Sequence, residues 1–340
     1  MQGMIVANPM NIKYLTGLDA EGTLLITRKE NFFLTDARYL EEVKSVLTIN
    51  DDIIVNDIAN ITRDDYENFF LFCENVGFEE NYVTYSMYKR YMERYKIHNL
   101  EETEYMLEKQ RMIKDEEEIE LIEKACNITD ECFKYICDFI KIGKTEREIA
   151  FEIEKFFCEN GAEGVSFETI VASGKNSSKP HAVPTDKKIE AGDTITIDMG
   201  CRYKGYCSDM TRTIFAGYVP VEVQRIYDLV LKNQLQTLKE MKEGASIRLI
   251  SRMVENDFKL NGYDLVHALG HGVGLDIHEM PFISGKNDNT LKANMVITNE
   301  PGIYLPNHFG VRIEDTVLIT KSGCINLTKS DKNYIVVDKT

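Results

Sequence analysis

The sequence lacks three features that would place it in common functional classes. It has no apolar run near the roughly 18 residues that a membrane helix needs and no recognisable secretory signal. Its 40 Lys and Arg are outnumbered by 56 Asp and Glu, which argues against sequence-independent nucleic-acid binding, since phosphate contacts need clustered cations. Its eight cysteines include no CxxC pair. We therefore expect no membrane span, no nucleic-acid partner, and buried free thiols in a cytoplasmic protein.

Three common enzyme motifs are also absent. Residues 278–282 read HEMPF, not the HExxH of zincins. The GKT at 143–145 lacks the upstream glycine of a P-loop, because position 138 is Asp138. The glycines within 270–274 do not open a helix after a strand, which argues against a dinucleotide-binding fingerprint.

The length predicts about two domains, each with a buried core. In residues 1–112, the short apolar runs MIVA, TLLIT, NFFLT and DIIVN alternate with helical stretches at 37–47 and 84–95. This alternation predicts a small α/β domain. Residues 103–117 are polar, charged and helical in period, which predicts a linker helix. The second domain is expected over 113–340.

The second domain contains a duplicated frame that carries four acids. Residues 189–198, IEAGDTITID, and residues 291–300, LKANMVITNE, are each a turn and an alternating strand that ends on an acid. Each is followed by a further strand with another acid, Asp209 or Glu314. Acids at equivalent places in a repeat predict one site built around a pseudo-twofold axis.

Two amphipathic helices are predicted ahead of each pair of strands. Thr145 with Glu148 forms a capping box for one of them, and Gly161 stands at its expected end. Equivalent glycines recur in the second half at one constant offset. A helix–helix–strand–strand order that occurs twice predicts an α+β fold in which helices cover one side of a curved antiparallel sheet.

Strand alternation places the acids on polar faces. In TITID, Asp198 lies opposite the two isoleucines, and in VRIEDTV, Arg312 and Glu314 lie opposite Asp315. A solvated surface is the simpler interpretation for any single acid. Four acids at repeat-equivalent positions, with a histidine segment between them, instead predict a site for two divalent metals.

The six histidines separate into two groups. His98 and His308 have no motif around them and are expected to be structural or exposed. The segment HALGHGVGLDIHE, residues 267–279, lies between the two pairs of acids, and its glycines permit close backbone approach to a ligand. The remaining candidates for a functional site are His181, His267, His271 and His278.

These segments together resemble a known family. PHAVPTDKKIEAGDTITIDMGCRYKGYCSDMTRT, HALGHGVGLDIHEMP, ITNEPGIY and VRIEDT are similar to the pita-bread metallopeptidases, especially the Xaa-Pro aminopeptidase branch, with the prolidases nearby. NIKYLTG and LTDARYLEE resemble the creatinase-like N-terminal domain of that branch. The resemblance implies a pita-bread catalytic domain over 113–340 after a creatinase-like domain over 1–112. Relatives usually have an additional first helix, so the first domain is expected to be truncated at its start.

The resemblance implies a dinuclear metal site. Two of the residues, Asp209 and Glu314, would bridge both ions, and the family metal is usually manganese or cobalt. An oxygen-rich set with one imidazole is compatible with Mn²⁺, while Co²⁺, Zn²⁺ and Fe²⁺ stay open. The implied ligands are Asp198, Asp209, His271, Glu300 and Glu314.

The resemblance also implies catalytic roles. A hydroxide shared by the two metals would attack the peptide carbonyl, and Glu300 would carry its proton to the leaving nitrogen. His181 and His278 would stabilise the tetrahedral intermediate and contact substrate, and His267 would line the subsite, although HALG replaces the more usual HGTG. Arg312 is expected to hold a ligand carboxylate, with an ordinary surface arginine as the alternative.

Several functions remain open. The leading expectation is an aminopeptidase acting on peptides with proline at the second position. A prolidase that cleaves only dipeptides is a close alternative, and a catalytically silent peptide-binding module is a more distant one. Methionine aminopeptidases usually lack the first domain, and creatinase-like enzymes lack the metal set. Relatives are often homodimers, so a homodimer is expected.

Overall fold

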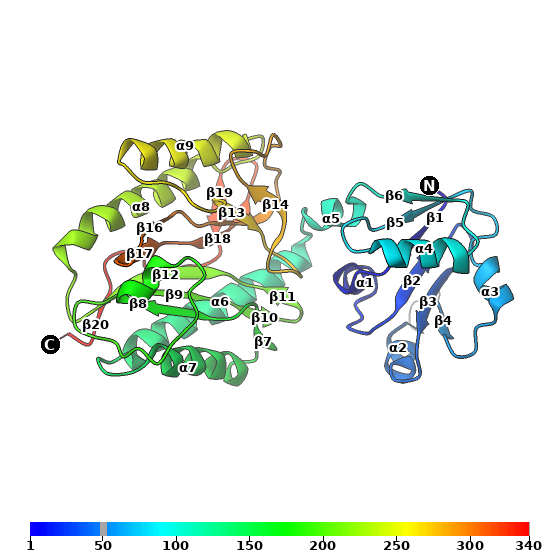
Figure 1. Ribbon diagram of the computed structural model, residues 1–340, viewed down its shortest axis with the longest axis horizontal. Helices are drawn as coiled ribbons and strands as arrows, with labels where there is room; N and C mark the ends of the chain where they lie inside the picture. The colour runs from blue at the N-terminus through cyan, green and yellow to red at the C-terminus, as the bar shows by residue number, and fades with distance from the viewer. Residues whose placement is uncertain (48–52, 340) are drawn as a thin grey trace. The chain divides into compact units, whose positions relative to one another are not determined.

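A six-stranded mixed sheet forms the first unit, Met1–Arg111, of the computed structural model, which describes residues 1–47 and 53–339 (Figure 1). The strand order is β4-β3-β2-β1-β5-β6, and β2 pairs antiparallel with both of its neighbours. The strands are β1 (Gly3–Val6), β2 (Thr23–Ile26), β3 (Asn31–Thr35), β4 (Ile53–Asp57), β5 (Asn75–Phe78) and β6 (Asn99–Glu102). The helices are α1 (Pro9–Thr16), α2 (Leu40–Leu47), α3 (Arg63–Asn68), α4 (Tyr85–Arg94) and α5 (Met106–Arg111).

The four predicted strands and two predicted helices of this unit are confirmed, apart from their ends. The helix predicted over 37–47 begins at Leu40, and Asp52 of the predicted strand DIIVN lies outside the described residues. The sequence interpretation did not name β5 or β6, since NVGF and NLEE are too short and too polar to show a period of two.

The linker helix predicted over 103–117 is confirmed only in part. Within that range α5 covers Met106–Arg111, residues 112–115 are not helical, and α6 starts afresh at Glu116. The side chain of Asp115 accepts a hydrogen bond from the backbone N–H of Glu118 and closes a capping box, which favours a new helix start. The backbone N–H of Lys114 donates instead to the carbonyl of Asn294, 2.9 Å away. Local capping and this long-range bond outweigh the helical period of the segment.

The second unit, Met112–Thr340, repeats two helices and a group of strands. The first half contains α6 (Glu116–Phe139), α7 (Glu146–Glu159), β7 (Gly164–Val165), β8 (Ile170–Ser173), β9 (Thr194–Met199), β10 (Cys201–Tyr203), β11 (Tyr206–Cys207) and β12 (Met210–Ala216). The second half contains α8 (Val221–Glu240), α9 (Ile247–Leu260), β13 (Gly270–Gly272), β14 (Glu279–Ile283), β15 (Val296–Asn299), β16 (Gly302–Leu305), β17 (Phe309–Arg312), β18 (Asp315–Ile319), β19 (Cys324–Asn326) and β20 (Val336–Val337).

The repeat is visible in the strand pairing. In the first half β9 lies between β8 and β12, and in the second half β15 lies between β13 and β18, with all four pairs antiparallel. The strands are divided among several sheets, and β20 adds to β12 in parallel. The predicted capping box of Thr145 and Glu148 is present at the start of α7. The predicted order of helices and antiparallel strands is therefore confirmed.

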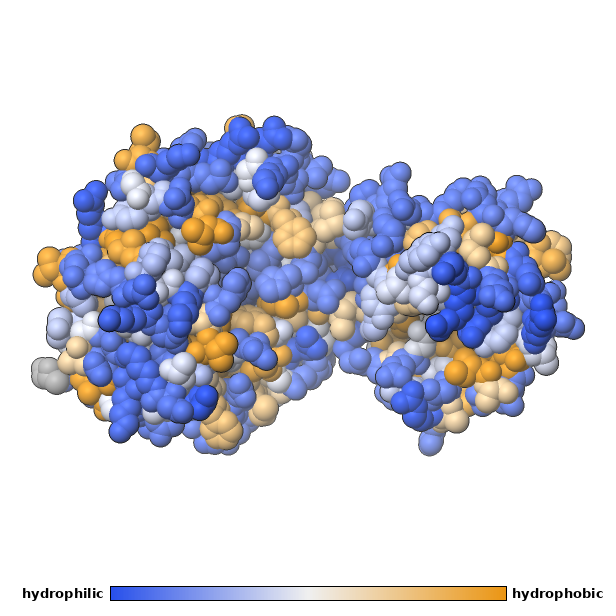
Figure 2. Space-filling view, in the orientation of Figure 1, coloured by the Kyte–Doolittle hydropathy of each residue, from blue (hydrophilic) through white to orange (hydrophobic). Residues whose placement is uncertain are grey.

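Apolar faces of the strands pack against the helices in both halves. Ile195 and Ile197 of β9 lie in one core with side chains of α6 and α7, and Ile297 of β15 lies in another with side chains of α8 and α9. In Figure 1 these helix pairs lie on opposite outer edges of the unit, with the strands between them. Figure 2 shows hydrophobic patches on this face between the two helical edges. The acids are thereby left on the faces that do not meet the helices.

The strand predicted over VRIEDTVLI is interrupted. It ends as β17 at Arg312 and resumes as β18 at Asp315, so Glu314 lies in the break. The predicted polar face continues beyond this break. Thr316, the next residue predicted on that face, donates a 2.7 Å hydrogen bond from Oγ1 to the carbonyl of Asp209. Strand alternation placed Asp315 on the apolar face. The residue is fully buried there, and its charge is compensated by a 2.7 Å ion pair with Arg212.

No helix in the described part of the chain is long and apolar enough to cross a membrane. The eight cysteines are all free, and Cys126, Cys132, Cys201 and Cys207 are buried.

Candidate metal centre

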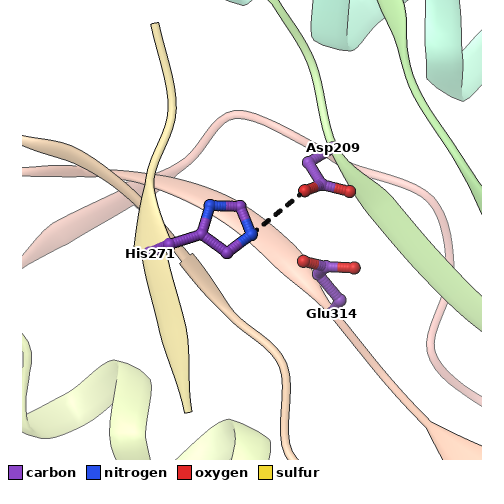
Figure 3. A group of neighbouring side chains, drawn as sticks. All are labelled: Asp209, His271 and Glu314. Atoms are coloured by element: carbon purple, nitrogen blue, oxygen red, sulfur yellow. Dashed lines mark ion pairs between the residues drawn. The ribbon is translucent and has the colours of Figure 1, made fainter. Parts of the chain in front are cut away.

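Three side chains from different elements converge between the two halves of the repeat. Asp209 precedes β12, His271 lies in β13 and Glu314 lies between β17 and β18. One potential ligand atom from each lies within 4.8 Å of the others, and all three residues are buried. Figure 3 shows the imidazole and both carboxylates directed at a common point. A buried site of this composition suits a divalent cation.

The two other predicted ligands border this cluster. Asp198, in β9, is paired across the sheet with Thr211 of β12. Glu300 follows β15, and its Oε1 lies 3.5 Å from His271 Nε2, while Asp209 Oδ2 lies 3.4 Å from the same atom. All five predicted ligands, and the three remaining candidate histidines, line one cavity of about 430 Å³.

The ring orientation of His271 leaves Nε2 available to a metal. Nδ1 lies 3.1 Å from the carbonyl oxygen of Gly272, which can only accept, so the proton of the neutral ring sits on Nδ1. Burial lowers the pKa of His271 to about 4, which keeps the ring neutral near pH 7. The lone pair of Nε2 therefore faces the carboxylates.

The acids are crowded beyond what protein cations compensate. Burial, and then the charges of its carboxylate neighbours, raise the pKa of Asp209 well above its usual value, and the same causes act on the pKa of Glu314. Burial raises the pKa of Glu300 to about 7. Arg312 is the only Lys or Arg among the described residues that line the cavity. Excess negative charge in a buried site is what divalent cations would neutralise.

A buried oxygen without a partner supports the same conclusion. Asp198 Oδ1 is buried and has no hydrogen-bond partner in the described part of the chain, whereas its Oδ2 accepts from Arg312 Nη2 at 2.6 Å. A buried carboxylate oxygen without a hydrogen-bond partner costs free energy of folding unless it coordinates a cation. The donor set thus fits divalent metal ions.

Arg312 is a buried anchor and not an ordinary surface arginine. Besides Asp198, it donates from Nε to Thr211 Oγ1 at 3.0 Å and from Nη1 to Tyr304 Oη at 2.6 Å. Thr211 Oγ1 in turn donates to Glu314 Oε2 at 2.6 Å. These contacts fix the orientation of one carboxylate from each half of the repeat.

The predicted substrate-binding histidines lie around the metal cluster. The His278 ring meets that of His271 edge to face, with centroids 4.4 Å apart, and burial lowers the pKa of His278. His267 Nε2 lies 3.0 Å from Tyr304 Oη, and burial lowers the pKa of His267 to about 4. His181 is exposed at the cavity wall. The two histidines predicted to be structural or exposed, His98 and His308, do not line this cavity.

Three polar side chains of the site were missed by sequence reasoning. Tyr304, Thr211 and Thr298 each hold a predicted site residue, and Thr298 Oγ1 lies 3.2 Å from Glu300 Oε1. The alternation of SDMTRT puts Thr211 on the same face as Asp209, but a hydroxyl alone does not reveal which distant carboxylate it will contact. Tyr304 stands in the ITNEPGIY segment and showed no signal of its own.

The two parts of the chain match two known domain families. Residues 120–321 match metallopeptidase family M24, and residues 1–113 match the creatinase/prolidase N-terminal domain. The chain is 37% identical to an uncharacterized peptidase, YqhT, of Bacillus subtilis, over 99% of this chain and 96% of that one. It is also 37% identical to a Xaa-Pro dipeptidase of Pyrococcus furiosus, over 98% and 94% of the two chains.

Solved structures agree with this assignment. A Xaa-Pro dipeptidase from Bacillus anthracis superposes with a TM-score of 0.93 at 35% identity, covering 99% of this chain and 95% of that chain. An X-Pro aminopeptidase from Thermotoga maritima superposes with a TM-score of 0.90 at 34% identity, covering 99% and 98%. The fold is therefore the pita-bread fold with a creatinase-type first domain, as predicted. The protein belongs to metallopeptidase family M24 and is a hydrolase of the peptidase class.

Proposed function

We propose that this protein is an aminopeptidase that uses two divalent metal ions to hydrolyse the bond between an N-terminal residue and a following proline. The observation that carries the proposal is that one cavity collects the four predicted carboxylate ligands, the unprotonated Nε2 of His271 and three further histidines. A silent binding module would have no need to bury so many uncompensated acids.

The metal ligands in this proposal are contributed by both halves of the repeat. Two divalent ions, when bound, would supply Lewis acidity that polarises the peptide carbonyl and activates a water for attack. Mn²⁺ suits a set dominated by carboxylate oxygens with one imidazole. The residues that would hold the ions are Asp198, Asp209, His271, Glu300 and Glu314.

The remaining steps belong to side chains of the chain itself. Glu300, whose pKa burial raises to about 7, would accept a proton during attack and deliver it to the leaving nitrogen, because catalysis is most effective when the pKa lies near the working pH. His278 and His181 would donate hydrogen bonds to the carbonyl oxygen as its negative charge develops. His267, held by Tyr304, would line the subsite next to the scissile bond. Arg312 would keep Asp198 in position.

Proline selectivity follows from the chemistry of the bond. The nitrogen of an Xaa-Pro bond carries no N–H, and the ring fixes the backbone on its C-terminal side. The cavity wall beside His181 offers Pro180, Ala182 and Pro184 as apolar neighbours for a pyrrolidine ring.

The cation content of the cavity favours an aminopeptidase over a dipeptidase. A dipeptide places its free C-terminal carboxylate beside the proline ring, where a cation is needed. Arg312, the only Lys or Arg among the described cavity residues, spends four of its five N–H groups on Thr211, Tyr304, Asp198 and the carbonyl of Pro180. A dipeptidase is the second candidate, since the relative from Pyrococcus furiosus has that name.

Hydrolysis of Ala-Pro-Ala and Ala-Pro, measured with and without added Mn²⁺, tests the proposal. We expect Mn²⁺-dependent release of alanine from the tripeptide at a higher kcat/KM than from the dipeptide. Ala-Ala-Ala serves as the control for proline selectivity. Preference for the dipeptide would favour the second candidate, and no cleavage of either proline peptide would contradict both.

A further inference from the structure

A surface groove continues from the catalytic cavity along helix α7. It has a volume of about 800 Å³ and shares Glu168, Thr169 and Pro184 with the cavity lining. Its other wall is formed by side chains of α7, among them Phe151, which is 67% exposed. Neither the metal ligands nor the candidate catalytic histidines line this groove, so the proposed reaction does not account for it.

The continuity with the cavity identifies what the groove can hold. This step rests on the proposed function. An aminopeptidase that cuts the first peptide bond accommodates a single residue on the N-terminal side of that bond. A channel that leads out of the cavity over several residues can therefore hold only the chain on the C-terminal side of the proline.

The dimensions of α7 suit a short peptide. Arg147, Phe151 and Glu154 follow one another at spacings of four and three residues, so they form a stripe along one face of the helix. Seven residues of helix span about 10 Å, which equals roughly three residues of extended chain. A peptide of four or five residues would therefore have its C-terminal part beside this stripe.

The charges of the groove favour a cationic peptide. Arg147 is paired with Asp186 at 2.7 Å, and Glu148 is occupied in the capping box of α7. Glu154 and Glu168 are exposed and have no hydrogen-bond or ion-pair partner in the described part of the chain. Glu168 stands where the groove leaves the cavity, beside Pro184, and Glu154 stands further along α7.

We infer that this groove is an extended substrate subsite that binds the residues following the proline and prefers a basic side chain among them. Glu168 and Glu154 are its specificity-determining residues, because an ammonium or guanidinium group of the peptide would complete their unpaired carboxylates. Phe151 supplies apolar contact for the aliphatic stem of a lysine or arginine.

Two tetrapeptide amides test the preference. Ala-Pro-Lys-Gly-amide and Ala-Pro-Glu-Gly-amide differ only in the charge after proline, and amidation removes the terminal carboxylate. With Mn²⁺ at low salt, we expect kcat/KM to be at least about threefold higher for the lysine peptide, the size of an exposed ion pair. The ratio should approach one in the double variant Glu168→Gln/Glu154→Gln. Glu159→Gln, also exposed on α7 but outside the groove, should keep it.

A binding measurement separates this inference from the proposed reaction. Analogues of both peptides carry a methylene in place of the scissile carbonyl. They are titrated calorimetrically, with Mn²⁺ present, into the wild-type protein, the double variant Glu168→Gln/Glu154→Gln and the control Glu159→Gln. The subsite is supported, even if no peptide is cleaved, when the glutamate analogue binds more weakly than the lysine analogue and this difference in affinity disappears only in the double variant. Equal affinities for the two analogues, or a preference that survives in the double variant, overturn the subsite even if both peptides are cleaved.

Discussion

Arg312 Nη2 donates a 2.6 Å hydrogen bond to Asp198 Oδ2, and this bond joins the end of β17 to β9. The pair is almost completely buried. The same guanidinium reaches Tyr304 and, through Thr211, the carboxylate of Glu314. One side chain thus orients acids from both halves of the repeat.

Arg312→Lys is expected to weaken Mn²⁺ binding by about 10- to 100-fold, because an ammonium cannot replace the planar fork that contacts four partners at once. The fold should be retained, since a positive charge remains beside Asp198. Mn²⁺ titration followed by calorimetry measures the loss. Arg225→Lys, an exposed arginine of α8, is the matched control and should bind as the wild type does.

Asp209→Asn is expected to abolish Mn²⁺ binding while stabilising the metal-free protein. Burial, and then the charges of Glu314 and Asp198, raise the pKa of Asp209, so a neutral amide at this position removes both penalties. In thermal unfolding, the metal-free variant should have a higher Tm than metal-free wild type, but Mn²⁺ should raise that Tm far less. A variant that still retains two Mn²⁺ by elemental analysis would show that Asp209 does not bridge them.

Metal affinity is expected to fall as the pH is lowered through 7. Burial raises the pKa of Glu300 to about 7 in the metal-free protein, so below that pH a proton occupies the carboxylate and must leave before an ion binds. Above pH 7 this competition disappears. The apparent Kd for Mn²⁺ should increase by about tenfold per pH unit for one displaced proton between pH 7 and 5.5. A pH-independent Kd across that range would contradict the assignment of Glu300 as a ligand.

Lys114→Met is expected to destabilise the second unit by about 3–5 kcal/mol. Lys114 Nζ lies 2.6 Å from Glu279 Oε1, and the two side chains are only 1% and 7% exposed, so the substitution breaks a buried ion pair by removing its cation. Urea denaturation measures the change in the free energy of unfolding. Lys329→Met removes a cation from an exposed pair with Glu123 and should change stability by only about 0–1 kcal/mol.

The acids of the site could be predicted from the sequence because they obey local rules. Asp198 follows a period of two in its strand, and Glu300 occupies the equivalent place one repeat later. Asp315 shows the limit of that reasoning. Its position in the alternation places it on the apolar face, but the buried guanidinium of Arg212 lies beside it and makes a buried carboxylate tolerable. Alternation assigns a face without revealing which distant charge will meet it.

The sequence by itself determined the repeat, the order of helices and strands and the matched places of the four acids, because periodicity, capping and repeat position can be followed along the chain. The pita-bread fold and the place of His271 in the candidate site were implied by the family resemblance of its motifs. Only the tertiary structure decided that Tyr304 links His267 to Arg312, that Lys114 is neutralised by Glu279, and that α7 meets Glu168 along a groove. These contacts join residues that are far apart in the chain, or that no periodic pattern distinguishes from their neighbours. They depend on packing in three dimensions, which no local pattern encodes.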